Sequence, residues 1–321
     1  MRALAHDVYG SADVLELRQV PRPEVGSGDV LVRVHATALD RGVWHIVAGR
    51  PLVARLALGL RRPKNPIPGR DVAGVVEAVG ADVTEFRPGD EVFGSAPGAF
   101  AEYARTAPKR LAHKPAALTF EHAAALSISG ATALLALRDK GRVQAGQRVL
   151  IIGASGGVGT YAVQLAKVFG AHVTGVCSAG KADLVLALGA DEVLDYARDD
   201  IGHDRYDLVL DIAGNRSLRR LRRVLQPRGT LVIVGGEGGD RFTGGLDRNL
   251  RAAVWSLFLR QRMNFFVASE RGADFATLGE LAAAGRITPA IEEVVPLEGA
   301  PDALRRMEEG SIRGKVAISL R

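Results

Sequence analysis

The chain has 321 residues, a net charge of +6 and a single cysteine, Cys177, and 47% of its residues are hydrophobic. This length and composition are typical of a globular protein with one large domain or two smaller ones. A single cysteine excludes a disulfide framework and a four-cysteine zinc site.

Neither a signal peptide nor a membrane span is visible in the sequence. The stretch MRALAHDVYGSADVLEL lacks the apolar core of a signal peptide, and the apolar stretch in RAAVWSLFLRQR is too short to cross a bilayer. We therefore expect a cytoplasmic protein without a membrane partner. The arginine clusters in RLALGLRRPKNP and NRSLRRLRRVLQPRG contain no interleaved aromatic residues, so we also expect no nucleic-acid partner.

Residues 1–117 are predicted to form short strands separated by turns. Apolar runs such as DVLVRVHATAL and DVAGVVEAVG are typical of strands, and glycine and proline punctuate them in PRPEVGSGD and RPGDEV. This pattern predicts a β-rich domain.

Residues 118–263 alternate between predicted helices and strands. EHAAALSISGATALLALRDKG and VGTYAVQLAKVFG are typical of helices, whereas QRVLIIGA, AHVTGVCS, YDLVLDIAG and GTLVIVGG are typical of strands buried on both faces. The alternation predicts an α/β fold with a doubly wound parallel sheet. Residues 264–321 return to mixed structure, with a predicted strand NFFVAS, a helix ADFATLGELAAAG and a last strand GKVAISL.

The stretch IIGASGGVGTYA joins a predicted strand to a predicted helix. Glycines in such a turn permit a tight bend, close approach of backbone N–H groups to a pyrophosphate, and close packing of the helix on the strand. The start of the helix adds partial positive charge. We therefore predict a dinucleotide site at Ala154, Ser155, Gly156, Gly157, Val158 and Gly159.

The end of the next predicted strand favours NADPH over NADH. Sites for NAD place a carboxylate there to bind the ribose hydroxyls, but this strand ends in Cys177 and Ser178 and carries no carboxylate. Ser178 can donate a hydrogen bond to a 2′-phosphate, Lys181 can supply positive charge, and Tyr196 can add its hydroxyl. Alternatively, Lys181 is a surface lysine and the site accepts both cofactors.

The sequence resembles the medium-chain dehydrogenase/reductase superfamily, and within it the zinc-free quinone oxidoreductase-like branch, also called zeta-crystallin-like. The matching segments, in chain order, are PGRDVAGVVEAVGADVTEFRPGDEVFG, SGATALLAL, GASGGVGTYAVQLAK, LGADEVLDY and GKVAISL. The resemblance implies a GroES-like catalytic domain of residues 1–117 completed by 264–321, and an inserted Rossmann NADP(H)-binding domain of residues 118–263. It also implies a homodimer that pairs through NFFVAS, with an active-site cleft between the domains.

Further cofactor contacts are expected at Ser129, Thr132, Gly235, Gly236, Phe266 and Lys315. Ser129 and Thr132 resemble positions on the nicotinamide side of the cofactor, and the two glycines would let the backbone pass close to the nicotinamide ring. Phe266 either lines the pocket or packs in the core. Lys315 either faces the cofactor or lies on the surface.

The superfamily also contains zinc alcohol dehydrogenases, whose three catalytic-zinc ligands would fall at Asp40, Arg70 and Ile128. An arginine does not ligate zinc and isoleucine has no donor atom, so we expect no catalytic zinc, and the cysteine count excludes a structural one. Arg70 and Asp71 are then available to pair with each other or to line the cleft.

Without a metal, quinones and α,β-unsaturated carbonyls are easier hydride acceptors than plain ketones, because they delocalise the developing negative charge themselves. Candidate proton donors are His45, Asp40 and Tyr103, although His45 is equally compatible with a hydrogen-bonded histidine that takes no part in catalysis. Two alternatives remain: a zinc-free alcohol dehydrogenase or enoyl reductase on the same fold, and a non-catalytic NADPH-binding redox sensor or RNA-binding protein.

Overall fold

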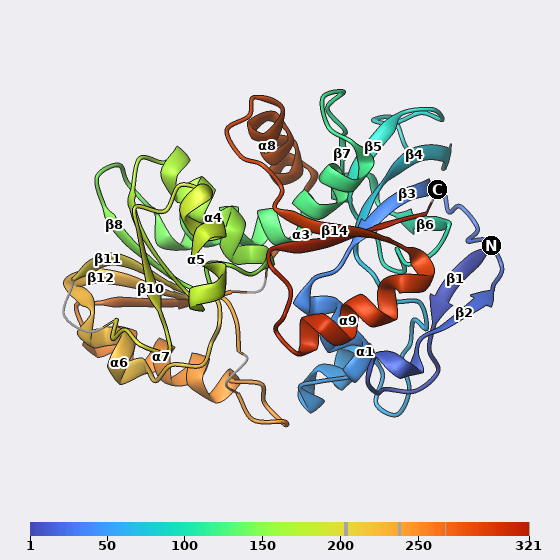
Figure 1. Cartoon of the computed structure of the whole chain (residues 1–321). Helices are drawn as coiled ribbons and strands as arrows, with labels where there is room; N and C mark the ends of the chain where they lie inside the picture. The colour runs from blue at the N-terminus through green and yellow to red at the C-terminus, as the bar shows by residue number, and fades with distance from the viewer. Residues whose placement is uncertain (202–204, 237–238, 267, 321) are drawn as a thin grey trace. The chain divides into compact units, whose positions relative to one another are not determined.

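The computed structural model describes residues 1–201, 205–236, 239–266 and 268–320, which form two compact units (Figure 1). Unit 1 comprises Met1–Ala131 and Glu270–Arg321, and unit 2 comprises Thr132–Ser269. The two boundaries between the units, at 131/132 and 269/270, lie later in the chain than the boundaries that we expected at 117/118 and 263/264. The first falls within helix α3 (Phe120–Leu135), because Ile128 N–H is tied to Asp71 of unit 1 by a 2.7 Å hydrogen bond.

Unit 2 contains a six-stranded sheet in which each neighbouring pair is parallel. Its strands, in spatial order, are β10 (Glu192–Asp195), β9 (His172–Cys177), β8 (Arg148–Ile152), β11 (Tyr206–Asp211), β12 (Leu225–Ile233) and β13 (Arg262–Phe265). This is the doubly wound order in which chain direction across the sheet reverses between the first and fourth strands, here β8 and β11. The predicted Rossmann fold is confirmed.

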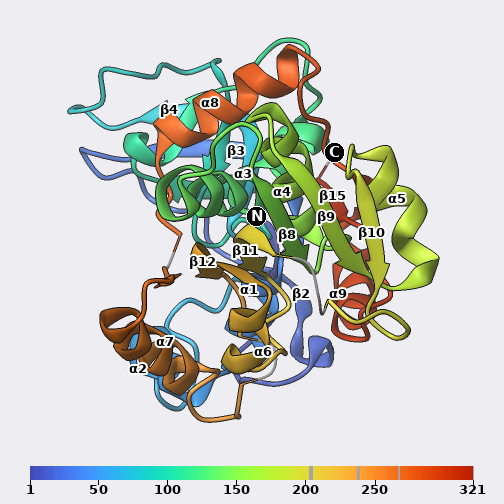
Figure 2. The ribbon, with the colours of Figure 1, turned by 90° about the vertical axis from the view of Figure 1, so that its left-hand side faces the viewer.

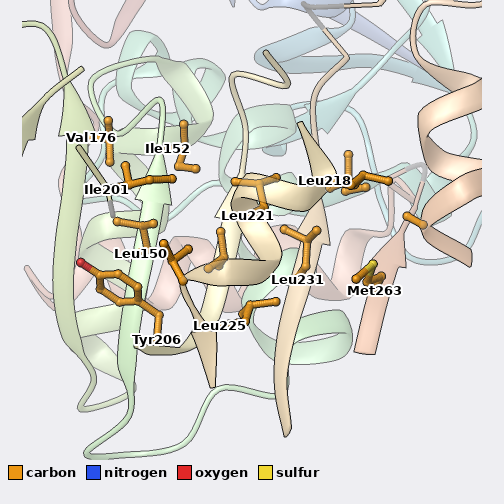
Figure 3. Packing of buried hydrophobic residues seen from close by; sticks show 14 residues of the cluster. Leu150, Ile152, Val176, Ile201, Tyr206, Leu218, Leu221, Leu225, Leu231 and Met263 are labelled. Carbon is orange, nitrogen blue, oxygen red and sulfur yellow. The ribbon is translucent and has the colours of Figure 1, made fainter. Parts of the chain in front are cut away.

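Helices cover both faces of this sheet (Figures 1 and 2). They are α4 (Gly157–Val168), α5 (Ala182–Ala187), α6 (Leu218–Arg223) and α7 (Leu246–Phe258). Figure 3 shows one of the cores, in which Leu218 and Leu221 of α6 meet Leu150, Leu225 and Leu231 of the strands. Strands buried on both faces explain why these segments are continuous apolar runs.

Unit 1 is built on a seven-stranded sheet with a separate two-stranded ribbon. The sheet contains β14 (Ile291–Pro296), β15 (Lys315–Ser319), β3 (Val30–Ala38), β4 (Asp71–Val79), β5 (Glu91–Ser95), β7 (Leu111–His113) and β6 (Tyr103–Thr106), and the ribbon contains β1 (Arg2–Ala5) and β2 (Glu16–Gln19). β15 pairs antiparallel with β3, so the end of the chain completes the N-terminal sheet. The GroES-like architecture is therefore built from both ends of the chain, as expected.

Unit 1 also contains helices that the sequence analysis did not assign. They are α1 (Arg41–Ala48), α2 (Arg55–Leu58) and α9 (Ala300–Glu308), in addition to the predicted α8 (Gly272–Ala283). Asp40 is the N-cap of α1 and its Oδ1 accepts a hydrogen bond from Val43 N–H, while Gly49 ends the helix in the left-handed conformation. These are standard helix start and stop signals, and the short periodic segment between them was missed.

One helical segment is long and apolar enough to pass a membrane-span test by composition. It comprises α3 and the π-helical turn Ala136–Gly141 that continues it, and 78% of its apolar window is buried inside the protein. Since a buried core helix passes the same test, this segment is weak evidence for a membrane span.

Candidate functional site

The glycine-rich turn joins β8 to α4 in the manner of a dinucleotide site. Gly156 is the N-cap of α4 and offers no side-chain hydrogen bond to the helix start. The first N–H groups of an α-helix lack intrahelical acceptors, so those of Gly157 and Val158 are available for an anion. A Cβ on Gly159 would collide with the carbonyl oxygen of Gly153, which explains the third glycine. Ala154 and Ser155 are buried in the turn itself.

The predicted 2′-phosphate residues lie together at the carboxyl ends of β9 and β10. The backbone N–H of Lys181 donates to Ser178 O over 2.9 Å, and Tyr196 N–H donates to Cys177 O over 3.1 Å. The Tyr196 side chain is exposed and Lys181 is half-buried. The structure therefore brings Ser178, Lys181 and Tyr196 to one corner of unit 2, where they form a polar edge with one cation.

A carboxylate that the sequence analysis missed lies at the same corner. Asp195 pairs in register with Cys177 across β10 and β9. Burial raises the pKa of the Cys177 thiol, and the negative charge of Asp195 raises it further, whereas Lys181 opposes the rise. Although β9 carries no carboxylate, the neighbouring strand supplies one. The sequence does show Asp195, near the end of the predicted strand DEVLDY. However, only the order of strands in the sheet shows that Asp195 lies beside Cys177.

A buried ion pair lies at the carboxyl end of β11, next to β8 in the sheet. Asp211, at the end of β11, pairs with Arg248 of α7, and its Oδ1 accepts from Gly214 N–H over 3.1 Å. Burial raises the pKa of Asp211, and the charge of Arg248 opposes that rise. A Cβ on Gly235 would collide with Ile212 O. Glycine is thus required at position 235 by the protein backbone itself, whether or not a nicotinamide lies near.

The positions of the remaining predicted residues of unit 2 do not test their predicted roles. Gly236 is exposed after β12, and Thr132 is half-buried at the first position of the unit. Phe266 is half-buried directly after β13, beside the exposed Phe265. None of these positions distinguishes a pocket-lining residue from a structural one.

Lys315 is the centre of a buried polar network in unit 1. Its residue exposure is 1%, so the surface alternative is wrong. The Nζ atom donates to Leu39 O over 2.7 Å and lies 3.2 Å from Asp71 Oδ2 and 3.3 Å from Ser129 Oγ. Ser129 comes from α3, Asp71 from β4 and Lys315 from β15, so the ammonium group ties together three distant segments of the chain.

Asp71 is itself fully buried within this network. Burial raises its pKa from 3.8 to about 7, the nearby charge of Asp40 raises it as well, and Lys315 and the Ile128 N–H oppose the rise. Asp40 uses Oδ1 for the α1 cap, whereas its buried Oδ2 has no hydrogen-bond partner among the described residues. Sequence analysis considered Asp71 a partner for Arg70 and missed its pairing with Lys315.

The three candidate proton donors are not gathered in one place. His45 lies in the last turn of α1, and its Nδ1 is 2.8 Å from Arg50 O. Tyr103 lies on β6 with the Arg22 guanidinium 3.9 Å from its ring centre, in a charged surface cluster in which Arg22 pairs with Glu77. Asp40 caps α1 and Tyr103 stacks on arginine, so both have evident structural roles.

In this chain, Asp40, Arg70 and Ile128 occupy the positions that ligate zinc in related enzymes. Arg70 forms an ion pair with Glu270, which also binds Arg110 at 3.2 Å and Ser95 Oγ at 2.6 Å. Arg70 and Asp71 therefore pair with separate partners. Among the described residues, no group of three or more His, Cys, Asp or Glu side chains could hold a metal ion. A guanidinium and an isoleucine side chain at two of the three positions do not fit zinc.

The two folds, the glycine turn and the polar corner after β9 define a dinucleotide-dependent oxidoreductase. Two family models match the chain: an alcohol dehydrogenase GroES-like domain over residues 26–116, and a zinc-binding dehydrogenase domain over residues 188–318. The second description names zinc, whereas this chain carries Arg70 and Ile128 at two of the three expected ligand positions.

Several curated relatives match almost the whole chain. The mitochondrial NAD(P)H oxidoreductase RTN4IP1 of Danio rerio is 32% identical over 100% of this chain and 91% of its own length. The chloroplastic quinone-oxidoreductase QR1 of Triphysaria versicolor is 33% identical over 99% and 98%. The 2-methylene-furan-3-one reductase of Solanum lycopersicum is 32% identical over 99% and 79%.

A solved structure of a mycobacterial protein, Rv1454c in complex with NADPH, matches with a TM-score of 0.85 and 27% identity over 99% of this chain and 100% of that one. This chain belongs to the medium-chain dehydrogenase/reductase superfamily, in its quinone oxidoreductase-like branch. Membership places it among the NAD(P)H-dependent oxidoreductases.

The expected cytoplasmic location is contradicted by these relatives. Both RTN4IP1 and QR1 are named as organellar proteins, mitochondrial in one case and chloroplastic in the other. The expectation rested on a single cysteine and the absence of an apolar leader. Those features exclude a disulfide-rich secreted protein, but they carry no information that distinguishes one reducing compartment from another.

Proposed function

We propose that this protein is an NADPH-dependent reductase that transfers hydride to quinones or α,β-unsaturated carbonyls without a catalytic zinc. The observation that carries the proposal is the glycine-capped start of α4, which has no side-chain cap, together with Ser178 and Lys181 after the end of β9. In this proposal unit 2 binds the dinucleotide and unit 1 is the catalytic unit. The names of QR1 and the tomato reductase, one a quinone and one an enone enzyme, support the two acceptor classes.

Different residues of unit 2 would bind the two phosphate groups of the cofactor. N–H groups at the start of α4 would hold the pyrophosphate, and Lys181 and Ser178 would hold the 2′-phosphate. Asp195 acts against the 2′-phosphate by charge repulsion, so Lys181 must outweigh it for NADPH to be preferred. The NADPH in the Rv1454c structure supports this choice of cofactor. When bound, the reduced nicotinamide supplies the hydride.

The donor set of unit 1 supports the acceptor class. The positions that hold zinc in related enzymes carry Asp40, Arg70 and Ile128, and Arg70 is paired with Glu270, so this donor set does not fit a Lewis-acid metal. An acceptor that spreads the developing charge over its own conjugated oxygen and carbon atoms needs none. Reduction of a quinone to the hydroquinone then takes one hydride from the nicotinamide and one proton from the medium or a side chain.

Of the candidate proton donors, we infer that His45 is best suited. A carbonyl oxygen can only accept, so the 2.8 Å contact with Arg50 O places a proton on His45 Nδ1. In the neutral ring Nε2 is then an acceptor, and His45 acts as an acid only as the imidazolium. We prefer His45 because Asp40 is engaged as the N-cap of α1 and the Tyr103 ring lies under the Arg22 guanidinium.

We also propose that two copies of unit 2 associate through β13 and α7. β13 is the last strand of the six-stranded sheet in the described residues. Beside it, α7 exposes a stripe at helical spacing: Leu246, Leu250, Val254, Leu257 and Phe258, the last two 80% and 82% exposed. An apolar stripe of this size next to an unpaired strand edge is typical of a protein interface. A second copy would cover both features at once.

The first experiment follows the absorbance of NADPH, and separately of NADH, with a para-quinone, an α,β-unsaturated ketone, a plain ketone and an aldehyde. Consumption of NADPH with the quinone or the enone, unchanged by a chelator, is the expected result. Rapid turnover of the plain ketone would instead favour the alcohol dehydrogenase alternative. Cofactor binding without turnover, together with salt-sensitive RNA binding, would favour the non-catalytic alternative.

The matched variant is Lys181→Ala. It should weaken NADPH binding by about tenfold or more and leave NADH binding almost unchanged, because only NADPH carries the 2′-phosphate charge. Equal losses for the two cofactors would refute the assignment of Lys181. Exposed Lys140→Ala, at the end of the turn that continues α3, is the control for loss of one lysine elsewhere in unit 2.

A further inference from the structure

One stretch of unit 1 contains many cations and no anion. Residues 41–70 include Arg41, Arg50, Arg55, Arg61, Arg62, Lys64 and Arg70, and neither aspartate nor glutamate occurs between Asp40 and Asp71. We call residues 41–70 the basic segment. Over the whole chain, by contrast, 42 basic residues are accompanied by 36 acidic ones. The segment therefore concentrates the excess positive charge of the protein.

The tip of the basic segment exposes large apolar side chains. It is formed by the short helical turn Leu52–Ala54, by α2 and by the chain that follows. Val53 is 38% exposed, Leu56 is 70% exposed and Leu60 is 67% exposed. Three side chains of this size at the surface within eight positions of the chain are more than scattered surface leucines.

The backbone of this tip is held in place by hydrogen bonds. Tyr9 OH donates to Gly59 O over 2.6 Å, and Lys64 N–H donates to Leu58 O over 2.7 Å. Arg55 donates to Gly49 O over 2.9 Å and stacks over the Tyr9 ring. The leucines are thus presented by an ordered loop, and Arg55 is the cation that holds the loop to the unit.

The cations that follow the leucines form no ion pair within the part of the chain that the structure describes. For Arg61, Arg62 and Lys64 the structure shows no ion pair with any residue that it describes. Elsewhere the chain does pair its surface arginines, as in Arg220 with Asp200. Exposed leucines next to unpaired cations form an amphipathic surface whose charge is complementary to an anionic layer.

We propose that the tip of the basic segment docks the protein on the surface of an anionic lipid bilayer. The unpaired cations would lie at the phosphate level, and Leu56 and Leu60 would enter the boundary between head groups and acyl chains. A nucleic acid matches the charge, but it provides no environment for the leucines. Our expectation of no membrane partner considered only spanning segments and leaders, and this proposal departs from it. The proposal does not depend on the reaction proposed above.

The test is co-sedimentation of the full chain with vesicles of phosphatidylcholine alone or with one third phosphatidylglycerol. We expect binding to the anionic vesicles, weakened by salt, and little binding to the neutral ones. Leu56→Ser with Leu60→Ser should reduce binding to the anionic vesicles by about tenfold, because it removes the inserted groups and leaves the charge intact. Arg61→Gln with Arg62→Gln and Lys64→Gln should reduce it by at least as much.

Two control variants separate this surface from general charge and general hydrophobicity. The charge control removes three exposed arginines of unit 2, as R219Q/R223Q/R228Q, and the apolar control removes two exposed leucines, as L17S/L186S. Both should bind the anionic vesicles as the unchanged protein does. The proposal is overturned if the unchanged protein does not bind, if it binds neutral vesicles equally, or if the controls lose as much binding as the segment variants. The proposal is also overturned if the protein binds RNA more tightly than anionic vesicles and if Leu56→Ser with Leu60→Ser leaves the affinity for RNA unchanged.

Discussion

Replacing Lys315 with methionine should destabilise unit 1 by an amount that increases with pH. Methionine fills a similar volume without charge, so the change removes the ammonium group from a site where the residue is 1% exposed. Leu39 O would then lose the 2.7 Å hydrogen bond from Nζ, and Asp71 would lose its cation at 3.2 Å. The first loss acts at every pH, whereas the second depends on whether Asp71 is charged.

The expected magnitudes follow from the pKa of Asp71. Burial raises it from 3.8 to about 7 in the folded protein. The folded state therefore holds this proton more tightly than the unfolded state, so stability from Asp71 is complete below 3.8 and is lost as pH rises through about 7. Without Lys315 the pKa moves higher still, which steepens the loss above pH 7. At about pH 6, Lys315→Met should lower the free energy of unfolding by about 1–3 kcal/mol, because one buried carbonyl is left without a hydrogen bond. At about pH 8.5 it should cost about 3–5 kcal/mol, the cost of breaking a buried ion pair.

The assay is urea denaturation followed by circular dichroism at both pH values, for the unchanged protein, Lys315→Met, and Lys315→Met combined with Asp71→Asn. The asparagine keeps an oxygen for the Ile128 N–H and cannot ionise, so the double variant should lose the dependence on pH. Equal costs of Lys315→Met at the two pH values would refute the reasoning, and so would a double variant that retained the full dependence.

Four further predictions concern the proposed cofactor site, the proton donor and the dimer. Asp195→Asn should raise the preference for NADPH over NADH about threefold to tenfold in fluorescence titration, because it removes a charge beside the 2′-phosphate corner. Gly159→Ala should abolish detectable NADPH binding in the same titration, since its Cβ would collide with the carbonyl of Gly153; binding with unchanged affinity would exclude this turn as the site. His45→Gln should lower kcat about a hundredfold with KM for NADPH unchanged, and an unaltered kcat would exclude His45 as the proton donor. Leu257→Ser should shift the light-scattering mass from twice 34.0 kDa toward 34.0 kDa, and a monomeric mass for the unchanged protein would refute the dimer.

The Rossmann unit was predictable because its signals are local. The turn from Gly153 to Gly159 is one contiguous segment, and the buried strands around it are continuous apolar runs whose length and spacing imply parallel order. Helices α1 and α7 were missed although their signals are local as well. α1 is short, and its apolar residues follow a charged, glycine-containing first turn. The exposed leucines of α7 disturb the pattern of a helix with one buried stripe.

The sequence by itself determined the fold class, the glycine-rich turn before α4 and the absence of zinc-ligating side chains at Arg70 and Ile128. Each of these depends on residues that are adjacent in the chain or on the chemistry of one side chain. Only the tertiary structure showed which charged side chains lie next to one another. Asp195 meets Cys177, and Lys315 meets Asp71 from far along the chain, because strand order brings these positions together. Electrostatic energies depend on distance and burial, and neither quantity exists until the strands are packed.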